Sequence, residues 1–426
     1  MRGVHVPYNK MTSGLAIEKL QLPDHVVIPL HQHTGAPADA VVQKGDEVKA
    51  GQLIGQAKGY VSANIHASIC GAVKDIKDLY VPTGMKVKCV VIEGNGRDEK
   101  AFMDPLPESA SKEELLARIK DAGIVGMGGA QFPTHVKLDA KKPIDALIIN
   151  GSECEPFVTS DERLMMEHTE EILQGARIAM KILGVKKIIF AIEDNKKEAI
   201  EHVKQVCAGS EIDVRVLHSI YPQGAEKTLI YNTLKRVVPM GGLPLDVGVV
   251  VQNVATLKAI RDACYDGKPL IERVVTVTGS VKEPKNLMVP IGTEFSFLIE
   301  NCGGASEDLA KVINGGPMMG IAQPSLDVPV IKGTNCVLVM GSSMVRRYEE
   351  KDCIRCSRCV SVCPQDLLPT SIALYAKNKR YDDCEALSVM NCVECGCCSY
   401  VCPARIQIVQ YAKIAKSEII AKRRRG

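Results

Sequence analysis

CIRCSRCVSVCP, residues 353–364, carries four cysteines separated by two, two and three residues, and it ends in proline. The same spacing and the same final proline return in NCVECGCCSYVCP, residues 391–403. One copy of such a pattern could arise by chance, whereas two copies indicate a shared structural purpose. This doubled stretch decides the fold of the C-terminal part of the chain.

The spacing suits two cubane iron–sulfur clusters. A C-x2-C-x2-C loop can supply three thiolates to one cluster, and in the bacterial ferredoxin arrangement the cysteine before the proline ligates the other cluster. Structural zinc usually takes pairs of cysteines with a longer spacer, so zinc is the weaker alternative. We expect two 4Fe–4S clusters, the first held by Cys353, Cys356, Cys359 and Cys402, and the second by Cys392, Cys395, Cys398 and Cys363.

Composition limits the remaining possibilities. The chain has 426 residues, 17 cysteines and a formal net charge of +3, which indicates no nucleic-acid partner. MRGVHVPYNK, residues 1–10, lacks the pattern of a signal peptide, so we expect reduced thiols in the cytoplasm. No apolar stretch approaches the ~20 residues of a membrane span. We therefore expect a soluble or peripheral protein.

The N-terminal part consists of short β-type runs separated by turn residues. KGDEVKAGQLIG (44–55) and SICGAVKDI (68–76) resemble the strands and turns of the barrel-sandwich hybrid found in biotinyl and lipoyl domains. The resemblance implies a small β-rich domain with a structural role.

A glycine-rich loop follows a helix signal. Ser111 and Glu114 form a capping box ahead of an amphipathic segment, and GMGGAQFPTHVKL (126–138) comes after it. The loop does not match the dinucleotide-binding fingerprint, because Gln131 stands at the third glycine position and a helix precedes it. A phosphate cradle and a simple turn both remain open from the residues alone.

The next part alternates between strand and helix. Each of the apolar runs DALIIN (145–150), KKIIFAIED (186–194), DVRVLHSI (213–220) and DVGVVVQN (246–253) precedes a helical pattern. Such alternation predicts a parallel sheet covered by helices, with ligands outside the carboxyl ends of the strands. Polar groups and glycine gather after these strands, which indicates a site.

Four segments together carry a closer resemblance. GMGGAQFPTHVKL, NGSECEPFVTSDERL (150–164), YPQGAEKTLIY (221–231) and VVVQNVATL (249–257), followed by the ferredoxin cysteines, resemble the RnfC family, the C components of Rnf complexes. Those complexes are membrane-bound ferredoxin:NAD oxidoreductases that export sodium ions or protons. The same core is similar to the flavin-bearing, NADH-oxidising subunit of respiratory complex I, and the segment from ERVVTVTGS (272–280) resembles the SLBB module.

The resemblance covers nearly the whole chain and implies a multidomain α+β protein. Its expected parts are a barrel-sandwich hybrid (1–100), a Rossmann-like α/β domain for FMN and NADH (101–272), an SLBB β-grasp domain (273–341) and an α-helical ferredoxin domain with two clusters (342–426).

The resemblance also assigns roles to residues of the α/β domain. For non-covalently bound FMN it implies Gly126, Gly128, Gly129 and Lys137 at the phosphate, and Asn150, Glu153, Gly224, Glu226 and Asn253 around the ring and ribityl chain. Phe132 would stack on the nicotinamide nucleotide, and Glu155 would accept hydrogen bonds from it. Gln131 replaces a small residue of the complex I pattern. Ala225 replaces an acid there, which removes one contact to NADH and agrees with the Gly-Ala-Glu of the Rnf family.

The implied function is electron transfer with NAD(H) as substrate. NADH gives up two electrons as a hydride whereas a cluster accepts one, so a flavin must stand between them, and no side chain need act as an acid or base. The expected partners are the other Rnf-type subunits, both membrane-bound and ferredoxin-like, with peripheral attachment at the cytoplasmic face of the membrane. Two alternatives remain: a soluble protein that feeds a reductase such as proline reductase, and a flavin-free adapter that carries clusters.

Overall fold

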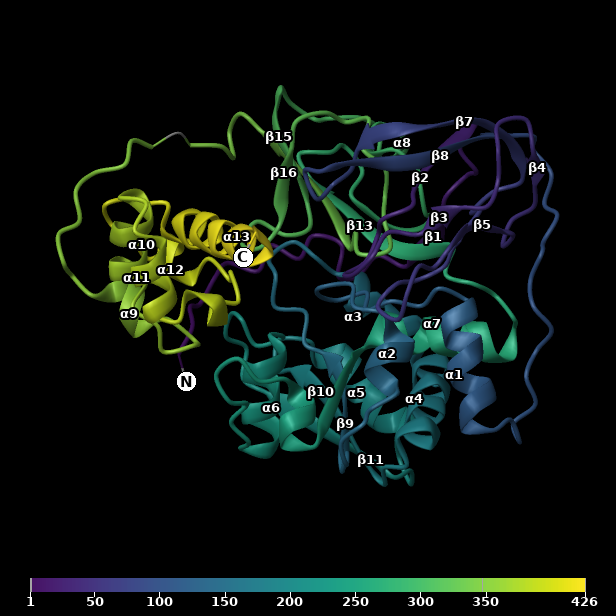
Figure 1. Cartoon of the computed structure of the whole chain (residues 1–426), viewed down its shortest axis with the longest axis horizontal. Helices are drawn as coiled ribbons and strands as arrows, with labels where there is room; N and C mark the ends of the chain where they lie inside the picture. Colours follow the sequence, from purple (N-terminus) through teal and green to yellow (C-terminus); the bar gives the residue numbers. More distant parts are fainter. Residues whose placement is uncertain (1, 347, 426) are drawn as a thin grey trace.

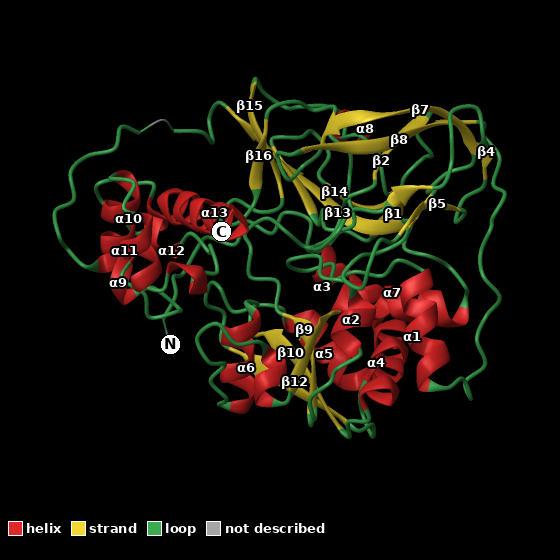
Figure 2. Cartoon of the chain, in the orientation of Figure 1, coloured by secondary structure: helices red, strands yellow, loops and turns green. Residues whose placement is uncertain are grey.

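The computed structural model describes residues 2–346 and 348–425, without the side chain of Arg425. In Figure 1 the β-rich parts lie at the top, the α/β domain lies at the bottom, and the C-terminal helices form a separate lobe at the left. Figure 2 shows that this lobe is built from helices and loops, whereas the α/β domain has helices packed around its strands.

The N-terminal β-rich domain is built from short strands around one apolar core. Its antiparallel sheets have the orders β2-β8-β7-β4 and β3-β5-β6. Alternate side chains such as Val26, Ile28, Val90 and Ile92 point inward and are buried, which fixes the register of the pairing between β2 and β8. The strands are β2 (His25–Pro29), β3 (Asp39–Ala40), β4 (Glu47–Val48), β5 (Leu53–Gln56), β6 (Ile65–His66), β7 (Gly71–Tyr80) and β8 (Lys86–Gly94).

The α/β domain contains the parallel sheet that the sequence predicts, in the order β11-β10-β9-β12. Its strands are β9 (Ala146–Gly151), β10 (Lys187–Glu193), β11 (Ile212–Leu217) and β12 (Val249–Asn253). The helical elements are α1 (Lys112–Asp121), α2 (Thr134–Leu138), α3 (Ser160–Glu167), α4 (Thr169–Leu183), α5 (Lys197–Val206), α6 (Glu226–Leu234), the 3-10 turn η1 (Pro244–Val247) and α7 (Val254–Tyr265). The predicted capping box is confirmed, since the Ser111 hydroxyl accepts from the Glu114 N–H and the Ser111 N–H donates to the Glu114 carboxylate.

The third part is a mixed sheet with one helix packed on it. The sheet order is β1-β14-β13-β17-β15-β16. Its elements are β13 (Glu272–Gly279), β14 (Lys285–Pro290), α8 (Phe295–Asn301), β15 (Leu309–Asn314), β16 (Ile321–Gln323) and β17 (Cys336–Gly341). The edge strand β1 (Ile17–Lys19) comes from the N-terminus and runs parallel to β14, so the first residues of the chain belong to this sheet.

The C-terminal lobe is helical and follows a long exposed connection after β17. It consists of α9 (Arg358–Ser361), α10 (Pro369–Lys377), α11 (Tyr381–Ala386), the 3-10 turn η2 (Val389–Asn391), α12 (Cys397–Tyr400) and α13 (Ile408–Arg425). A small apolar core that includes Ile372, Val389 and Ala415 holds α10, η2 and α13 together. Within residues 2–346 and 348–425, no helix has the length and apolar character needed to cross a membrane.

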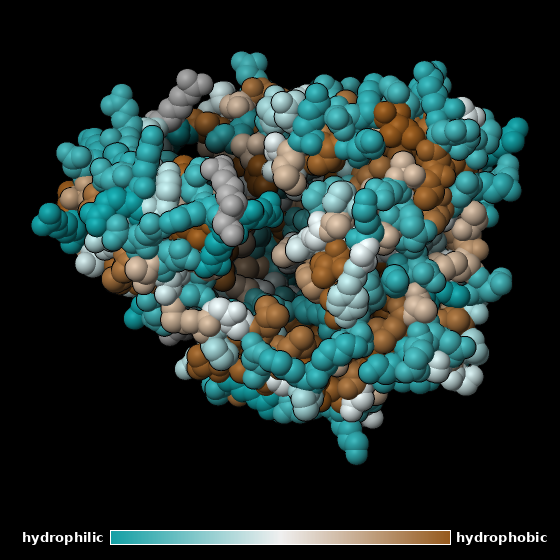
Figure 3. Space-filling view, viewed as in Figure 1, coloured by the Kyte–Doolittle hydropathy of each residue, from teal (hydrophilic) through white to brown (hydrophobic). Residues whose placement is uncertain are grey.

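An N-terminal segment, residues 2–19, ties these parts to one another. Val4 and Tyr221 each donate a backbone N–H to the other's carbonyl at 2.9 Å, and the Phe157 N–H donates to the Tyr8 carbonyl at 2.8 Å. Arg2 forms an ion pair of 2.6 Å with Asp366 in the helical lobe. Figure 3 shows that hydrophilic residues cover most of the viewed face, with a hollow at its centre.

Candidate functional site

The glycine-rich loop lies between α1 and α2 and faces the start of α7. The Gly126 N–H donates to the Phe132 carbonyl at 2.9 Å, and the Met127 N–H donates to the Thr256 hydroxyl at 2.9 Å. A Cβ on Gly128 would lie 2.6 Å from Nδ2 of Asn253, so only glycine fits there. Gly129 beside it is exposed and faces open space. An exposed glycine loop beside a helix N-terminus fits the phosphate group of FMN.

The carboxyl edge of the sheet brings the other predicted residues to the same region. Asn150 lies near the end of β9 opposite Asn253 of β12, and the Asn150 amide donates to the Gly224 carbonyl at 3.0 Å. A Cβ on Gly224 would lie 2.4 Å from the Ser152 carbonyl oxygen, so this close approach also requires glycine. The segment that follows β11 therefore packs directly against the segment that follows β9.

Four further predicted residues lie along the same edge. The Lys137 ammonium on α2 donates to the Glu226 carboxylate on α6 at 2.7 Å. Ala225 is the extended residue that precedes α6, and Phe132 is half-buried at the base of the glycine loop. The structure thus gathers the residues predicted for FMN and the nicotinamide nucleotide at one edge, with the exceptions of the Glu153 and Glu155 carboxylates.

The Glu153 side chain is buried at the start of α3. Its carboxylate accepts from the Asp161 N–H at 2.8 Å and from the Ser160 hydroxyl at 3.2 Å. It also lies 3.9 Å from the Lys10 ammonium. These contacts give Glu153 the role of a helix-capping acid, because its oxygens satisfy donors of the first turn of α3.

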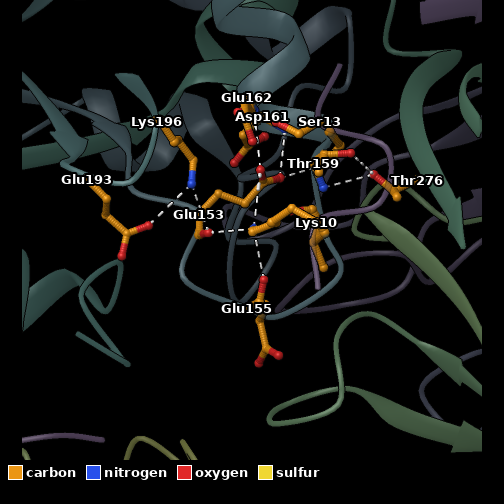
Figure 4. Close-up of polar contacts among 12 residues, drawn as sticks. Lys10, Ser13, Glu153, Glu155, Thr159, Asp161, Glu162, Glu193, Lys196 and Thr276 are labelled. Atoms are coloured by element: carbon orange, nitrogen blue, oxygen red, sulfur yellow. Dashed lines mark hydrogen bonds and ion pairs between the residues drawn. The ribbon is translucent and has the colours of Figure 1, made fainter. Parts of the chain in front are cut away.

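The Glu155 carboxylate points away from Glu153 and Lys10 (Figure 4). It accepts from the backbone N–H groups of Met318 and Met319 at 3.1 and 2.7 Å, and from the Tyr221 hydroxyl at 3.3 Å. Burial raises the pKa of Glu155 above its ordinary value, although these three donors oppose the effect. The acceptor that the sequence assigned to the nicotinamide nucleotide is therefore engaged by donors of the protein itself.

A buried ionic network lies behind the sheet edge (Figure 4). Lys10 donates to the carbonyls of Glu153 and Glu155 at 2.9 and 3.0 Å and also to that of Val158. The Lys196 ammonium lies 3.5 Å from the Glu193 carboxylate, and both side chains are almost fully buried. The chain thus encloses two lysines among several carboxylates, which hold the loop after β9 in place.

Burial changes the protonation of this network. Burial lowers the pKa of Lys10, which also lies near Lys196. For Asp161, burial and the neighbouring Glu153 raise the pKa to about 7, while the amide of Asn253 donates to the Asp161 carboxylate at 2.6 Å. Asp161 therefore links the capped helix α3 to the start of α7.

The four thiols predicted for the second cluster line one cavity in the helical lobe. Cys363, Cys392, Cys395 and Cys398 face it together with apolar residues such as Ile372 and Ile408. Burial raises the pKa of Cys398 to about 12 when no cluster is bound. Four thiols around one cavity, two of them buried and two half-buried, fit a 4Fe–4S cluster, whose iron would hold them as thiolates.

The thiols predicted for the first cluster lie on the outer side of the lobe. Cys359 and Cys402 are buried and pack together, whereas Cys353 and Cys356 are exposed. Cys397 is fully buried and donates its thiol to the Tyr221 carbonyl. It also lines the cavity of the second set, although it belongs to neither of the two expected ligand sets.

Comparison with protein-family models divides the chain into four matches. Residues 1–97 match the RnfC barrel sandwich hybrid domain, and residues 119–262 match the Nuo51 FMN-binding domain. Residues 274–322 match the SLBB domain, and residues 352–406 match the 4Fe-4S dicluster domain.

Curated relatives match over almost the full length. The C component of the proton-translocating ferredoxin:NAD(+) oxidoreductase complex of Clostridium ljungdahlii is 49% identical, over 98% of this chain and 93% of its own. Its counterpart in the Na(+)-translocating complex of Acetobacterium woodii is 43% identical, over 100% and 98%. The counterpart in the ion-translocating oxidoreductase complex of Rhodobacter capsulatus is 42% identical, over 98% and 82%. The chain belongs to the RnfC family.

Membership confirms the resemblance and the fold class that the sequence predicts. The FMN-binding and dicluster matches also confirm the cofactors, which are FMN and two 4Fe–4S clusters. The cluster assignment replaces the zinc alternative. The roles of the individual residues rest on the geometry described above.

Sequence reasoning missed several residues at this site. Lys10 and Tyr221 contact the loop after β9 from distant parts of the chain, and no local pattern marks either contact. The glycines of GGPMMG, residues 315–320, are typical of a turn and could have predicted one. That this turn binds the Glu155 carboxylate can be seen only in the folded protein.

Proposed function

We propose that this chain is the electron-entry subunit of an Rnf-type ferredoxin:NAD oxidoreductase. In this role it exchanges a hydride with NAD(H) at the α/β domain and passes single electrons through the two clusters to partner subunits. The proposal follows from family membership together with the arrangement of the two cofactor sites.

One observation carries the proposal. The Tyr221 hydroxyl donates to the Cys395 carbonyl at 2.8 Å. Tyr221 precedes the predicted flavin residue Gly224, and Cys395 is a predicted ligand of the second cluster. The edge that fits FMN and the cavity that fits a 4Fe–4S cluster therefore meet through a direct contact.

The chemistry requires a two-electron donor to be joined to one-electron acceptors. Bound FMN supplies that junction, because a flavin accepts a hydride as an electron pair and releases electrons singly. The glycine loop and α7 would hold the phosphate, while Asn150, Glu226 and Lys137 would orient the rest of the molecule at the sheet edge. No side chain at this edge needs to move a proton during hydride transfer.

The order of the clusters follows from their surroundings. The second cluster would receive electrons from the flavin, since Cys395 lies against the α/β domain. The first cluster would deliver them to the partner, since Cys353 and Cys356 are exposed on the outer side of the lobe.

The partners and location belong to the same proposal. The named relatives are parts of larger complexes, so we propose that other Rnf-type subunits, membrane-bound and ferredoxin-like, receive the electrons. Attachment would be peripheral, through those subunits, at the cytoplasmic face of the membrane. The names of the compared relatives favour this role over a soluble reductase partner and over a flavin-free adapter.

We propose the boundaries drawn from the sequence, with one change. These are 1–100 as barrel-sandwich hybrid, 101–272 for FMN and NADH, 273–341 as β-grasp, and 342–426 for the clusters, except that the strand Ile17–Lys19 pairs with the β-grasp sheet.

The Gly128→Leu variant tests the flavin site. Its side chain would meet Asn253, so the variant should lose FMN and NADH-dependent reduction of ferricyanide while both clusters remain. The matched control is Gly14→Ala, because a Cβ at Gly14 meets nothing within 4 Å. Retention of FMN by Gly128→Leu would contradict the placement of the phosphate.

A further inference from the structure

The turn GGPMMG, residues 315–320, joins β15 to β16 and has no part in the function described so far. Its backbone fits the Glu155 carboxylate closely. The Met318 and Met319 N–H groups donate to the two carboxylate oxygens at 3.1 and 2.7 Å. A Cβ on Gly316 would lie 2.2 Å from Oε2 of Glu155, so the approach depends on glycine at this position.

The opposite side of the same turn contacts the loop of the second cluster. A Cβ on Gly396, which follows Cys395, would lie 2.9 Å from the Met318 carbonyl oxygen. The Met318 side chain packs beside Tyr221, Cys395 and Cys397 in one apolar cluster. Met318 is therefore placed between the α/β domain and a segment that carries cluster ligands.

Tyr221 makes a second connection across the same boundary. Its hydroxyl lies 2.8 Å from the Cys395 carbonyl oxygen and 3.3 Å from the Glu155 carboxylate, and its own carbonyl accepts from the Cys397 thiol at 3.7 Å. Glu155 thus sits at the point where three parts of the chain meet: the loop after β9, the turn of the β-grasp sheet and the loop of the second cluster.

We infer that Glu155 and the 315–320 turn form a positioning junction that fixes the second-cluster loop, residues 392–398, against the flavin edge. This inference rests on the proposed function, and it gives Glu155 a role in positioning the domains. The junction forms no bond to a reacting group. Its residues would neither donate nor accept electrons or protons, so the junction would affect only the geometry between the flavin edge and the loop that carries Cys392, Cys395 and Cys398.

The first test needs no activity. In the full-length protein, Gly316→Ala would displace the Glu155 carboxylate, so the Met318 and Met319 amides should exchange hydrogen for deuterium faster than in the wild type. The control Gly14→Ala should leave that exchange unchanged. Unchanged exchange in Gly316→Ala would overturn the junction.

The second test follows the electrons by stopped-flow absorbance in protein loaded with FMN and iron. Reduction of the clusters by NADH should slow measurably in Gly316→Ala, because electron transfer becomes slower as the distance between the flavin edge and the second-cluster loop grows. Reduction of the flavin itself should stay within about twofold, since the positions of Gly128 and Asn253 are untouched. Equal slowing of both steps, or of neither, would overturn the inference.

Tyr221→Phe serves as the second variant if Gly316→Ala does not fold. It removes the hydroxyl that reaches Cys395 and keeps the ring in its apolar cluster. Cluster reduction should again slow while iron and FMN content stay at the wild-type level, and an unchanged rate would count against the junction. If NADH does not reduce the flavin in the wild type, the proposed function is wrong, but the junction is not thereby refuted. The amide exchange of Met318 and Met319 then still tests whether the junction exists.

Discussion

Replacing Lys10 by Met should loosen the loop after β9 without disturbing the sheet itself. Lys10 donates to the carbonyls of Glu153, Glu155 and Val158, and its side chain is 11% exposed. A buried acceptor that loses its donor costs about 1–3 kcal/mol, while removing the buried ammonium recovers part of its desolvation cost. We therefore expect the local free energy of opening to fall by about 3 kcal/mol.

Amide hydrogen exchange measures this local effect better than global unfolding, because a multidomain chain need not unfold in two states. The informative amides are those of Phe157, Thr159 and Asp161, which donate to Tyr8, Thr276 and Glu153. A loss of about 3 kcal/mol corresponds to exchange faster by roughly a hundredfold. Lys19→Met, an exposed lysine on the same segment, is the control. Exchange in Lys10→Met that matches this control would refute the role given to Lys10.

Two further variants have definite expected outcomes. Cys356→Ala should lose about half of roughly eight irons per chain. Cys397→Ala should keep them all, because Cys397 lies outside both expected ligand sets and donates its thiol to the Tyr221 carbonyl; equal losses on iron analysis would mean that the ligands are misassigned. Asp161→Asn tests the pH dependence of stability. The pKa of Asp161 is raised from 3.8 to about 7 in the folded state. Protonated Asp161 therefore contributes stability that is fully present below pH 3.8 and is lost as the pH rises through 7. The difference in the free energy of local opening between wild type and Asp161→Asn, measured by amide hydrogen exchange, should therefore shift against the wild type across that range. A flat difference would show that Asp161 titrates normally.

The features that could be predicted from the sequence are those with local signals. The alternation of strands and helices and the Ser111–Glu114 capping box arise within short stretches, and both have the structure expected of them. The doubled cysteine spacing is also local, and the four cysteines predicted for the second cluster line one cavity. The glycines of the 126–138 segment were also recognisable from the sequence. A close approach of two backbone segments requires glycine, so such a contact is marked by a glycine in the sequence.

The contacts that could not be predicted join residues far apart in the chain. Glu153 follows a strand at the expected edge, yet its carboxylate turns to the start of α3 because Lys10 and the N–H groups of that helix attract it. The Glu155 carboxylate accepts hydrogen bonds from the N–H groups of Met318 and Met319, in a turn more than a hundred residues further along the chain. A strand position indicates which edge a residue occupies, whereas the direction of its side chain depends on partners that only the tertiary fold brings near.

The central claim is that NADH electrons reach the clusters through a flavin bound at the sheet edge. The most direct measurement is an anaerobic titration of the full-length protein with NADH, followed by visible absorbance and electron paramagnetic resonance. Protein that carries about eight irons and stoichiometric FMN should show bleaching of the flavin band and then the signal of a reduced 4Fe–4S cluster. Protein that is replete in both cofactors but shows neither change on addition of NADH would contradict the account.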